Sequence, residues 1–221
     1  MSSVEYQSER FPTKDAGRRI RNARYEVRVA RSMDDLLMVY SIRSAVYIAE
    51  QDCPFAEEFD GNDHCATHFI AFSAGEPAGC LRVRFFADFV KFERLAVRKP
   101  FRRSTVAFEL VRCAVEFVRR KGFRRIYGHA REGLESFWAH FGAKPIPGRE
   151  EFMFSDHRYT EMLAEYEPLS DEITLAEDPM KILRPEGDWD REGILEFSRT
   201  RAVRSVSDNS VRTTQKPKNA A

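Results

Sequence analysis

The segment from residue 91 to 122 constrains the fold more than any other part of this 221-residue chain. It begins with a strand-like run in which Glu93, Leu95 and Val97 alternate onto one face, and a basic turn follows. Apolar side chains then recur at helical spacing up to Gly122, a residue that readily adopts the left-handed conformation after a helix. Strand, basic turn and amphipathic helix are therefore expected to follow one another directly.

The start of this helix is a candidate site for a phosphorylated ligand. The first amides of a helix have no partner within it, and the helix dipole places roughly half a positive charge at that end. A basic turn that leads into a helix, as residues 101–107 do, therefore favours phosphate binding. The alternative is a solvated helix start capped by Ser104, because serine is a common N-cap residue.

Strand and helix patterns alternate on both sides of this segment. The strand patterns cover Tyr25–Ala30, Thr67–Ser73, Ala78–Phe86, Arg124–His129, Phe152–Phe154 and Tyr159–Ala164, and helical spacing covers Met33–Glu50 and Leu134–Gly142. We expect an α/β (α+β) fold: a mixed, mostly antiparallel twisted sheet flanked by helices on both faces. One parallel pair is expected where the helix after the basic turn crosses over.

The order of motifs resembles the GNAT superfamily of acyl-CoA-dependent N-acetyltransferases. That family binds the pyrophosphate of coenzyme A on the backbone of an Arg/Gln-x-x-Gly-x-Gly/Ala turn. Arg102–Ala107 matches the turn at both ends, with Thr105 where the family usually has glycine. Phe137–Gly142 is similar to the family's Phe-Tyr-x-x-x-Gly helix, with Trp138 in place of tyrosine. The resemblance spans Tyr25–Tyr166 and implies the GNAT acyltransferase fold.

A second signature is similar to one bacterial branch of the family. That branch carries Arg-x-x-Val-Phe-x-x-Glu-Gln, then Asp-Gly-x-Asp, then Ala-Thr-His; the matching runs here are Arg43–Gln51, Asp60–Asp63 and Ala66–His68. Acyl-homoserine-lactone and N-acyl amino acid synthases share this layout more loosely and use longer acyl donors. The resemblance therefore implies acetyl-CoA as donor, or another acyl-CoA or an acylated acyl carrier protein (acyl-ACP).

Carried over residue by residue, the resemblance implies a cofactor site formed largely by backbone. Leu95, Ala96 and Val97 would hold the pantetheine arm of the donor. The pyrophosphate would lie on the turn and the first helical residues: Arg102, Arg103, Ser104, Thr105, Val106, Ala107 and Phe108. The acceptor would be a primary amine of a small molecule, and no metal is expected.

Glu93 is the first candidate for a general base, because the family often places a carboxylate that faces the acceptor at this strand position. Regular alternation places Glu93 on the face of Leu95 and Val97. The alternative is an ion pair with Arg94 or Arg82, since structural ion pairs are the commoner environment of a buried carboxylate.

The usual general acid of the family is the tyrosine that Trp138 replaces here, and an indole N–H releases no proton at a useful pH. Tyr127 and Tyr159 are alternative candidates. His157 is another, because its segment resembles the closing strand of the branch, where a histidine faces the cleft. A hydrogen-bonded structural role is the alternative for this histidine.

Asp60 and Asp63 lie three residues apart in a loop that contains glycine. Two such carboxylates suit a cationic acceptor or a metal ion, although capping of the loop is the simpler role. The resemblance to the lactone synthases instead implies that they bind Arg43 or Arg82. His68 precedes an apolar run and is expected to pack in the core.

The composition limits the classes of function. A net charge of +1 gives no basis for nucleic-acid binding, and no run approaches the ~20 apolar residues of a membrane span. The first residues lack the apolar stretch of a signal peptide, and the four cysteines lack metal-type spacing. A cytoplasmic protein is expected.

The chain is expected to divide into four parts. Residues 1–23 form a polar, basic arm, residues 24–166 the acyltransferase domain, residues 167–200 an acidic extension with a short helix, and residues 201–221 a disordered basic tail. The helix within Trp189–Arg199 would dock on the core or on a second subunit, so the sequence is compatible with a homodimer.

Three functions remain open at this point. The leading one is an N-acyltransferase that uses acyl-CoA, with acetyl-CoA and a small amine as its substrates. The second is a long-chain N-acyltransferase that uses acyl-ACP, suggested by four phenylalanines between residues 85 and 92. The third is a catalytically idle module that binds acyl-CoA, suggested by Thr105 and Trp138.

Overall fold

The computed structural model describes residues 25–203, which divide after Leu175 into two compact units. The predictions for the arm at residues 1–23 and for most of the tail at residues 201–221 lie outside the described residues. Within the described range, no helix is long and apolar enough to cross a membrane.

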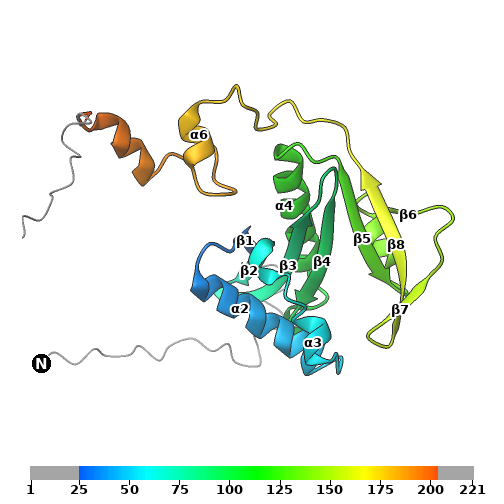
Figure 1. Ribbon diagram of the computed structural model, residues 1–221. Coiled ribbons are helices and arrows are strands. Elements are labelled where there is room, and N and C mark those ends of the chain that lie inside the picture. Colours follow the sequence, from blue (N-terminus) through cyan, green and yellow to red (C-terminus); the bar gives the residue numbers. More distant parts are fainter. Residues whose placement is uncertain (1–24, 204–221) are drawn as a thin grey trace, which may run out of the picture. The chain divides into compact units, whose positions relative to one another are not determined.

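The first unit is built on one eight-stranded sheet (Figure 1). The strands are β1 Tyr25–Val29, β2 Thr67–Ser73, β3 Glu76–Phe85, β4 Val90–Val97, β5 Arg125–Arg131, β6 Lys144–Pro145, β7 Phe152–Phe154 and β8 His157–Glu165. They lie in the order β1-β2-β3-β4-β5-β8-β6, with β7 paired to β8. All pairs are antiparallel except β4 with β5, which confirms the predicted fold class and its single parallel pair.

Two long helices pack on opposite faces of the sheet. They are α2 Met33–Arg43, which continues into the π-helical turn η1 Ser44–Ile48, and α4 Val106–Arg120. The shorter elements of this unit are α3 Phe55–Glu58, η2 Asp63–Cys65, η3 Lys99–Phe101 and α5 Glu135–Ala139. The predicted helices are therefore present, although Met33–Glu50 ends in a π-helical turn and Leu134–Gly142 is only one short helix.

The N-terminus of α2 is fixed by local hydrogen bonds. The hydroxyl of Ser32 accepts from the amide of Asp35, and the Asp35 carboxylate accepts from the Ser32 amide, which is a capping box. Arg28 on β1 lies 2.6 Å from the same carboxylate, and its hydrogen bonds hold the pKa of Asp35 well below the ordinary value. The helix is thereby tied to the first strand.

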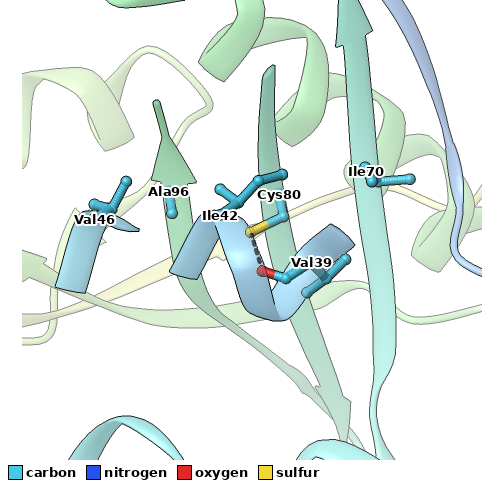
Figure 2. Packing of buried hydrophobic residues seen from close by; sticks show 6 residues of the cluster. All are labelled: Val39, Ile42, Val46, Ile70, Cys80 and Ala96. Atoms are coloured by element: carbon cyan, nitrogen blue, oxygen red, sulfur yellow. Dashed lines mark hydrogen bonds between the residues drawn. The ribbon is translucent and has the colours of Figure 1, made fainter. Parts of the chain in front are cut away.

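The core lies on both sides of β3 and β4. On one face, Val39, Ile42 and Val46 pack on the buried side chains of Ile70, Cys80 and Ala96 (Figure 2). On the other face, a Cβ atom at Gly79 would lie 2.8 Å from the carbonyl oxygen of Ala96 in the neighbouring strand β4 and 3.1 Å from the Leu110 side chain of α4. Glycine is therefore required at residue 79. The predicted packing role of His68 is confirmed, because its ring is 2% exposed.

The second unit contains two short helical elements, α6 Pro179–Leu183 and η4 Ile194–Thr200. Asp178 caps α6 through the amide of Met180. Arg184 donates to the carbonyl of Trp189 and pairs with Glu196 at 2.8 Å. The helix expected within Trp189–Arg199 thus corresponds to η4.

Candidate active site

The parallel pair at the centre of the sheet separates after three residues. Val90–Phe92 of β4 pair with Ile126–Gly128 of β5, whereas the pairing of β4 with β3 continues to Val97. A cleft of about 530 Å³ lies where the two strands diverge. Its walls come from β4 and β5, from Tyr47 and α3, from α5, and from the β7–β8 hairpin.

A β-bulge in β4 changes which side chains face this cleft. Cys80 of β3 pairs with Ala96, and Arg82 pairs with Glu93. Only one residue of β3, Leu81, therefore lies opposite the two residues Arg94 and Leu95. Arg94 has a positive φ of 56°, as a bulged residue often does. The prediction that Glu93 shares a face with Val97 is therefore wrong: Glu93 lies on the face of Ala96, which packs on α2.

Strand β5 borders two spaces, a small apolar cavity on the α4 face of the sheet and the cleft. On β5, Ile126 and Gly128 line a small apolar cavity with Val111 of α4. Side chains alternate along a strand, so Tyr127, His129 and Arg131 point to the opposite face, the one covered by α2. Lys91 is paired with Tyr127 on that same face. The α4 face of the sheet is thus apolar at this point, and the α2 face is polar.

The turn before α4 presents free backbone donors. Glu109 is the first residue of α4 whose amide donates to a backbone carbonyl, that of Thr105. Among the described residues, no protein acceptor takes the amides of Ala107 and Phe108. Thr105 is the N-cap at φ −86°, a conformation open to any residue, and its side chain makes no cap hydrogen bond. A glycine is therefore not needed at residue 105.

The side chains of the turn are only partly available. Ser104 is not the N-cap; its hydroxyl donates to Phe101 and accepts weakly from the Val106 amide at 3.4 Å. Arg102 pairs with Glu50 at 2.6 Å and donates to the carbonyl of Val97. Arg103, at φ 61°, is exposed and has no ion pair among the described residues.

The cofactor-strand residues named from the resemblance lie where β4 has left β5. Ala96 is buried, and Leu95 and Val97 are half-buried. Leu95 lines the cleft, and its carbonyl accepts a hydrogen bond of 2.8 Å from the hydroxyl of Tyr47. Burial raises the pKa of Tyr47 far above its ordinary value, so this hydroxyl stays a donor.

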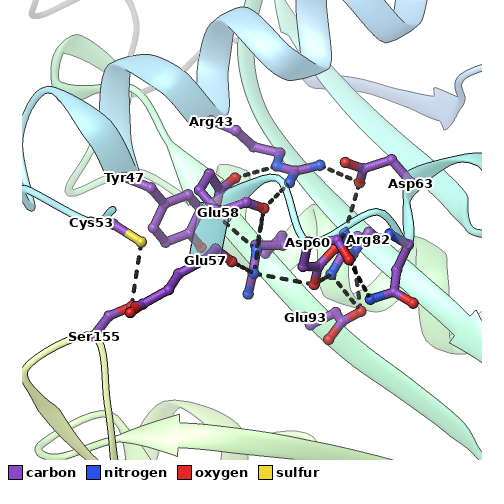
Figure 3. A network of polar contacts seen from close by, with 12 residues as sticks. Arg43, Tyr47, Cys53, Glu57, Glu58, Asp60, Asp63, Arg82, Glu93 and Ser155 are labelled. Carbon is purple, nitrogen blue, oxygen red and sulfur yellow. Dashed lines mark hydrogen bonds and ion pairs between the residues drawn. The ribbon is translucent and has the colours of Figure 1, made fainter. Parts of the chain in front are cut away.

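Beside the cleft lies a buried network of ion pairs (Figure 3). Arg82, which is 0% exposed, contacts Asp60, Asp63 and Glu93 at 2.6 to 2.9 Å. Arg43 pairs with Asp63 as well. Burial alone would raise the pKa of Asp60, but the hydrogen bonds from Arg82 hold it well below the ordinary value. Ion pairs with Arg43 or Arg82 are the alternative roles that the sequence indicated for Asp60, Asp63 and Glu93, and these ion pairs are the contacts observed.

A chain of three polar side chains leads from the cleft into β8. Nε2 of His129 lies 2.7 Å from the hydroxyl of Tyr127, and that hydroxyl donates to Glu161 at 2.5 Å. Because a phenol has one proton, Nε2 must carry a hydrogen and donate to Tyr127. Nδ1 of His129 then bears the lone pair. Among the described residues Nδ1 has no hydrogen-bond partner, and it is not a fully buried atom. Because His129 lines the cleft, a ligand there can reach this nitrogen.

The surroundings of His129 and Tyr127 shift the pKa of both side chains. Burial, and then the charge of Lys91, lowers the pKa of His129 to about 4. Burial and the carboxylate of Glu161 raise the pKa of Tyr127 above its ordinary value. At neutral pH, His129 is therefore a neutral ring with an available lone pair, and Tyr127 connects it to Glu161 instead of facing the cleft as an acid. Sequence reasoning named Tyr127 and missed His129.

Other candidates occupy different positions. His157 lies at the start of β8, beside the β7–β8 turn, and does not line the cleft, contrary to the expectation. Tyr159 and Trp138 do line it. Among the described residues, no group of three or more His, Cys, Asp or Glu side chains is arranged to hold a metal ion.

Of the four phenylalanines between residues 85 and 92, only Phe92 lines the cleft. Phe86 and Phe89 stack on each other with ring centroids 4.7 Å apart, and Phe85 packs on Phe123. Apart from Phe92, Tyr47 and His129, the aromatic residues of the cleft come from α5 and the β7–β8 hairpin.

Comparison with known proteins identifies relatives of the first unit. The sequence profile described as the acetyltransferase (GNAT) family matches residues 36–142. A Bacillus subtilis protein named "putative acetyltransferase BSU40680" is 30% identical over 125 residues, which are 55% of this chain and 84% of that protein.

Solved structures share the fold at low sequence identity. ElaA of Escherichia coli aligns with a TM-score of 0.58 at 22% identity, over 64% of this chain and 100% of its own. FeeM, an N-acyl amino acid synthase from uncultured soil microbes, aligns with a TM-score of 0.56 at 11% identity, over 65% and 91%. A GNAT family acetyltransferase from Elizabethkingia anophelis with acetyl-CoA bound aligns with a TM-score of 0.51 at 9% identity, over 64% and 98%.

Proposed function

The chain belongs to the GNAT family of acetyltransferases, and we propose that it transfers an acyl group from acyl-CoA, in the simplest case acetyl-CoA, to a primary amine of a small molecule. The observations that carry this proposal are the cleft between β4 and β5 and the amides at the start of α4 that have no acceptor among the described residues. The two are linked by Phe108 of α4, whose ring packs on Phe137 of the cleft wall. A relative of the same fold has been solved with acetyl-CoA bound, which supports the choice of donor.

On the donor side, the residues fit a nucleotide thioester. The free amides of Ala107 and Phe108, with the dipole of the fifteen-residue helix α4 behind them, suit the pyrophosphate. Arg103 adds an unpaired positive charge at the same turn. The edge of β4 from Leu95 to Val97, which β5 leaves uncovered, suits the amide-rich pantetheine arm. Bound acyl-CoA would supply the acyl group as an activated thioester.

On the acceptor side, His129 is the proposed general base. Nδ1 takes the proton that the amine nitrogen must lose as it attacks, and the Nε2–H bond to Tyr127 holds the ring in the required tautomer. Glu161 lies behind Tyr127 and supports the positive charge that His129 gains. The proton on Nδ1 can then pass to the departing sulfur. Glu93 is a less suitable base, because Arg82 and Lys91 already engage its carboxylate at 2.9 and 3.0 Å.

The first test is binding of coenzyme A to the full chain. Titration calorimetry is expected to give one site per chain with a dissociation constant within the usual range for enzyme substrates, about 1 μM to 1 mM. No detectable heat at about 1 mM coenzyme A would remove the proposed function. Thiol release from acetyl-CoA with a panel of amines then separates a working enzyme from an idle module.

Replacing Ala107 with proline tests the backbone site directly. Proline is tolerated in the first turn of a helix, but it removes one amide donor, so the fold should be kept while one hydrogen bond to the charged phosphate is lost. Coenzyme A affinity is expected to fall about tenfold to hundredfold. Ala107→Gly, which keeps the amide, is the matched control and should bind within about threefold of the unmodified chain. Equal affinity of both variants would show that this amide is not used.

A longer acyl donor is the second candidate. Phe137, Trp138, Phe152 and Phe154 give part of the cleft an apolar wall, and FeeM, an N-acyl amino acid synthase, shares the fold. A series from acetyl-CoA to dodecanoyl-CoA, with dodecanoyl-ACP alongside, distinguishes the candidates. A kcat/KM that rises with chain length favours this second function, and one that falls favours acetyl transfer.

A further inference from the structure

The charges in the cleft indicate the class of acceptor. We propose that the acceptor carries a carboxylate close to its amine, as a free amino acid does, and that Arg131 binds this carboxylate. The proposal rests on the proposed N-acyltransferase function and adds the substrate class.

Four cations line the cleft, and three of them are already engaged. Lys91 lies 3.0 Å from Glu93, and Arg94 lies 2.8 Å from Glu58. Arg84 lies 3.9 Å from Glu93 and stacks over the ring of Phe86. The fourth, Arg131, is half-buried, and its guanidinium has no hydrogen bond or ion pair to any described residue. A planar guanidinium without a partner suits bidentate binding of a carboxylate.

The cleft also contains one carboxylate without a cation. Asp60 and Glu93 are paired with arginines, whereas the carboxylate of Glu57 accepts only from the hydroxyl of Ser155 among the described residues (Figure 3). Arg94 donates to the backbone carbonyl of Glu57 and not to its carboxylate. Glu57 and Arg131 line the same cleft but do not pair with each other. A ligand that carries one charge of each sign can therefore match both.

The position of Arg131 agrees with the chemistry required of His129. The two residues are two apart on β5, so they point to the same face with a spacing of about 6.6 Å between their Cα atoms. A carboxylate held by Arg131 leaves an adjacent amino group near Nδ1 of His129. Both side chains lie on the α2 face, away from the proposed donor helix α4, so the acceptor does not compete for the donor site.

Matched acceptors that differ in one charge test this proposal. Phenylalanine and phenylalaninamide are suitable probes, because Phe152 and Phe154 line the cleft and the two molecules have the same shape. The chain is expected to acylate phenylalanine with a kcat/KM about tenfold to hundredfold above that of the amide. The amine of the amide loses its proton more readily, so intrinsic reactivity would give the opposite order.

Variants then assign the preference to one side chain. Arg131→Gln is expected to bring the ratio of the two kcat/KM values to about one, mainly through loss of phenylalanine turnover. Arg131→Lys keeps the positive charge but not the planar guanidinium, so the ratio should fall to a value between those of the unmodified chain and Arg131→Gln. Arg158→Gln is the control, because Arg158 is an exposed arginine on β8 outside the cleft and should leave the ratio unchanged.

Calorimetry with the same two probes in the presence of coenzyme A gives a readout that does not need turnover. Tighter binding of phenylalanine, lost in Arg131→Gln, supports the proposal even with a slow donor. Equal binding of both probes, or an equal loss of both in Arg131→Gln, overturns it. Failure of coenzyme A to bind would instead contradict the proposed function, so the two failures are distinguishable.

Discussion

Replacing His129 with glutamine is expected to lower kcat by about 10²- to 10⁴-fold, the usual contribution of a positioned general base. Glutamine can still donate to Tyr127 but has no basic nitrogen at the position of Nδ1. KM for acyl-CoA should change little, because His129 lies on the acceptor face of the cleft. Because the pKa of His129 is about 4, the base form persists through the neutral range and is lost only as the pH falls through about 4.

The role of the hydrogen-bonded chain is tested by Tyr127→Phe. This change keeps the ring but removes the hydroxyl that fixes the tautomer of His129, so kcat should fall about tenfold with KM unchanged. If His129→Gln retained more than about half of the activity at an unchanged melting temperature, proton transfer by this residue would be excluded.

Replacing Arg82 with leucine is expected to destabilise the chain by about 3–5 kcal/mol, as removal of one partner from a buried ion pair typically does. Arg82 is 0% exposed and is shared by Asp60, Asp63 and Glu93, so leucine would leave three carboxylates without their common cation. Chemical denaturation measures the loss, and thermal unfolding should shift down by roughly 10 °C.

Two further variants test whether the loss of stability in Arg82→Leu comes from the burial of the ion pairs. Arg82→Lys keeps a charge and should cost less than leucine. Arg112→Ala removes a pair with Glu109 on the surface of α4, where the arginine side chain is 71% exposed, and should change stability by less than about 0.5 kcal/mol. A loss below about 1 kcal/mol in Arg82→Leu would mean that water replaces the guanidinium in the folded state.

Local patterns were sufficient to predict most of the fold. The apolar run of β2 reflects a strand buried on both faces, and the helical spacing of α4 reflects one buried face. In both elements, burial decides the sequence pattern and the structure. The bulge at Arg94 was not predictable, because it depends on how β4 pairs with β3 and because arginine is not a residue type that indicates a bulge. The prediction of the strand face on which Glu93 lies was wrong for this reason.

The candidate site was only partly predictable for a related reason. Tyr127, His129 and Arg131 alternate with small or apolar residues in β5, and that pattern indicates a polar strand face in the sequence itself. Their roles depend on partners from elsewhere in the chain. Glu161 of β8 fixes the tautomer of His129 through Tyr127. That no carboxylate of the described residues pairs with Arg131 is likewise a property of the assembled cleft.

The positions proposed for donor and acceptor, on opposite faces of the sheet, have a kinetic consequence. A donor that enters beside α4 and an acceptor that enters beside α2 do not obstruct each other, so both can be bound before any bond is made. This arrangement favours sequential kinetics through a ternary complex over a covalent acyl-enzyme. A single molecule that joins coenzyme A to an amino acid through its sulfur would span both positions and act as a bisubstrate inhibitor.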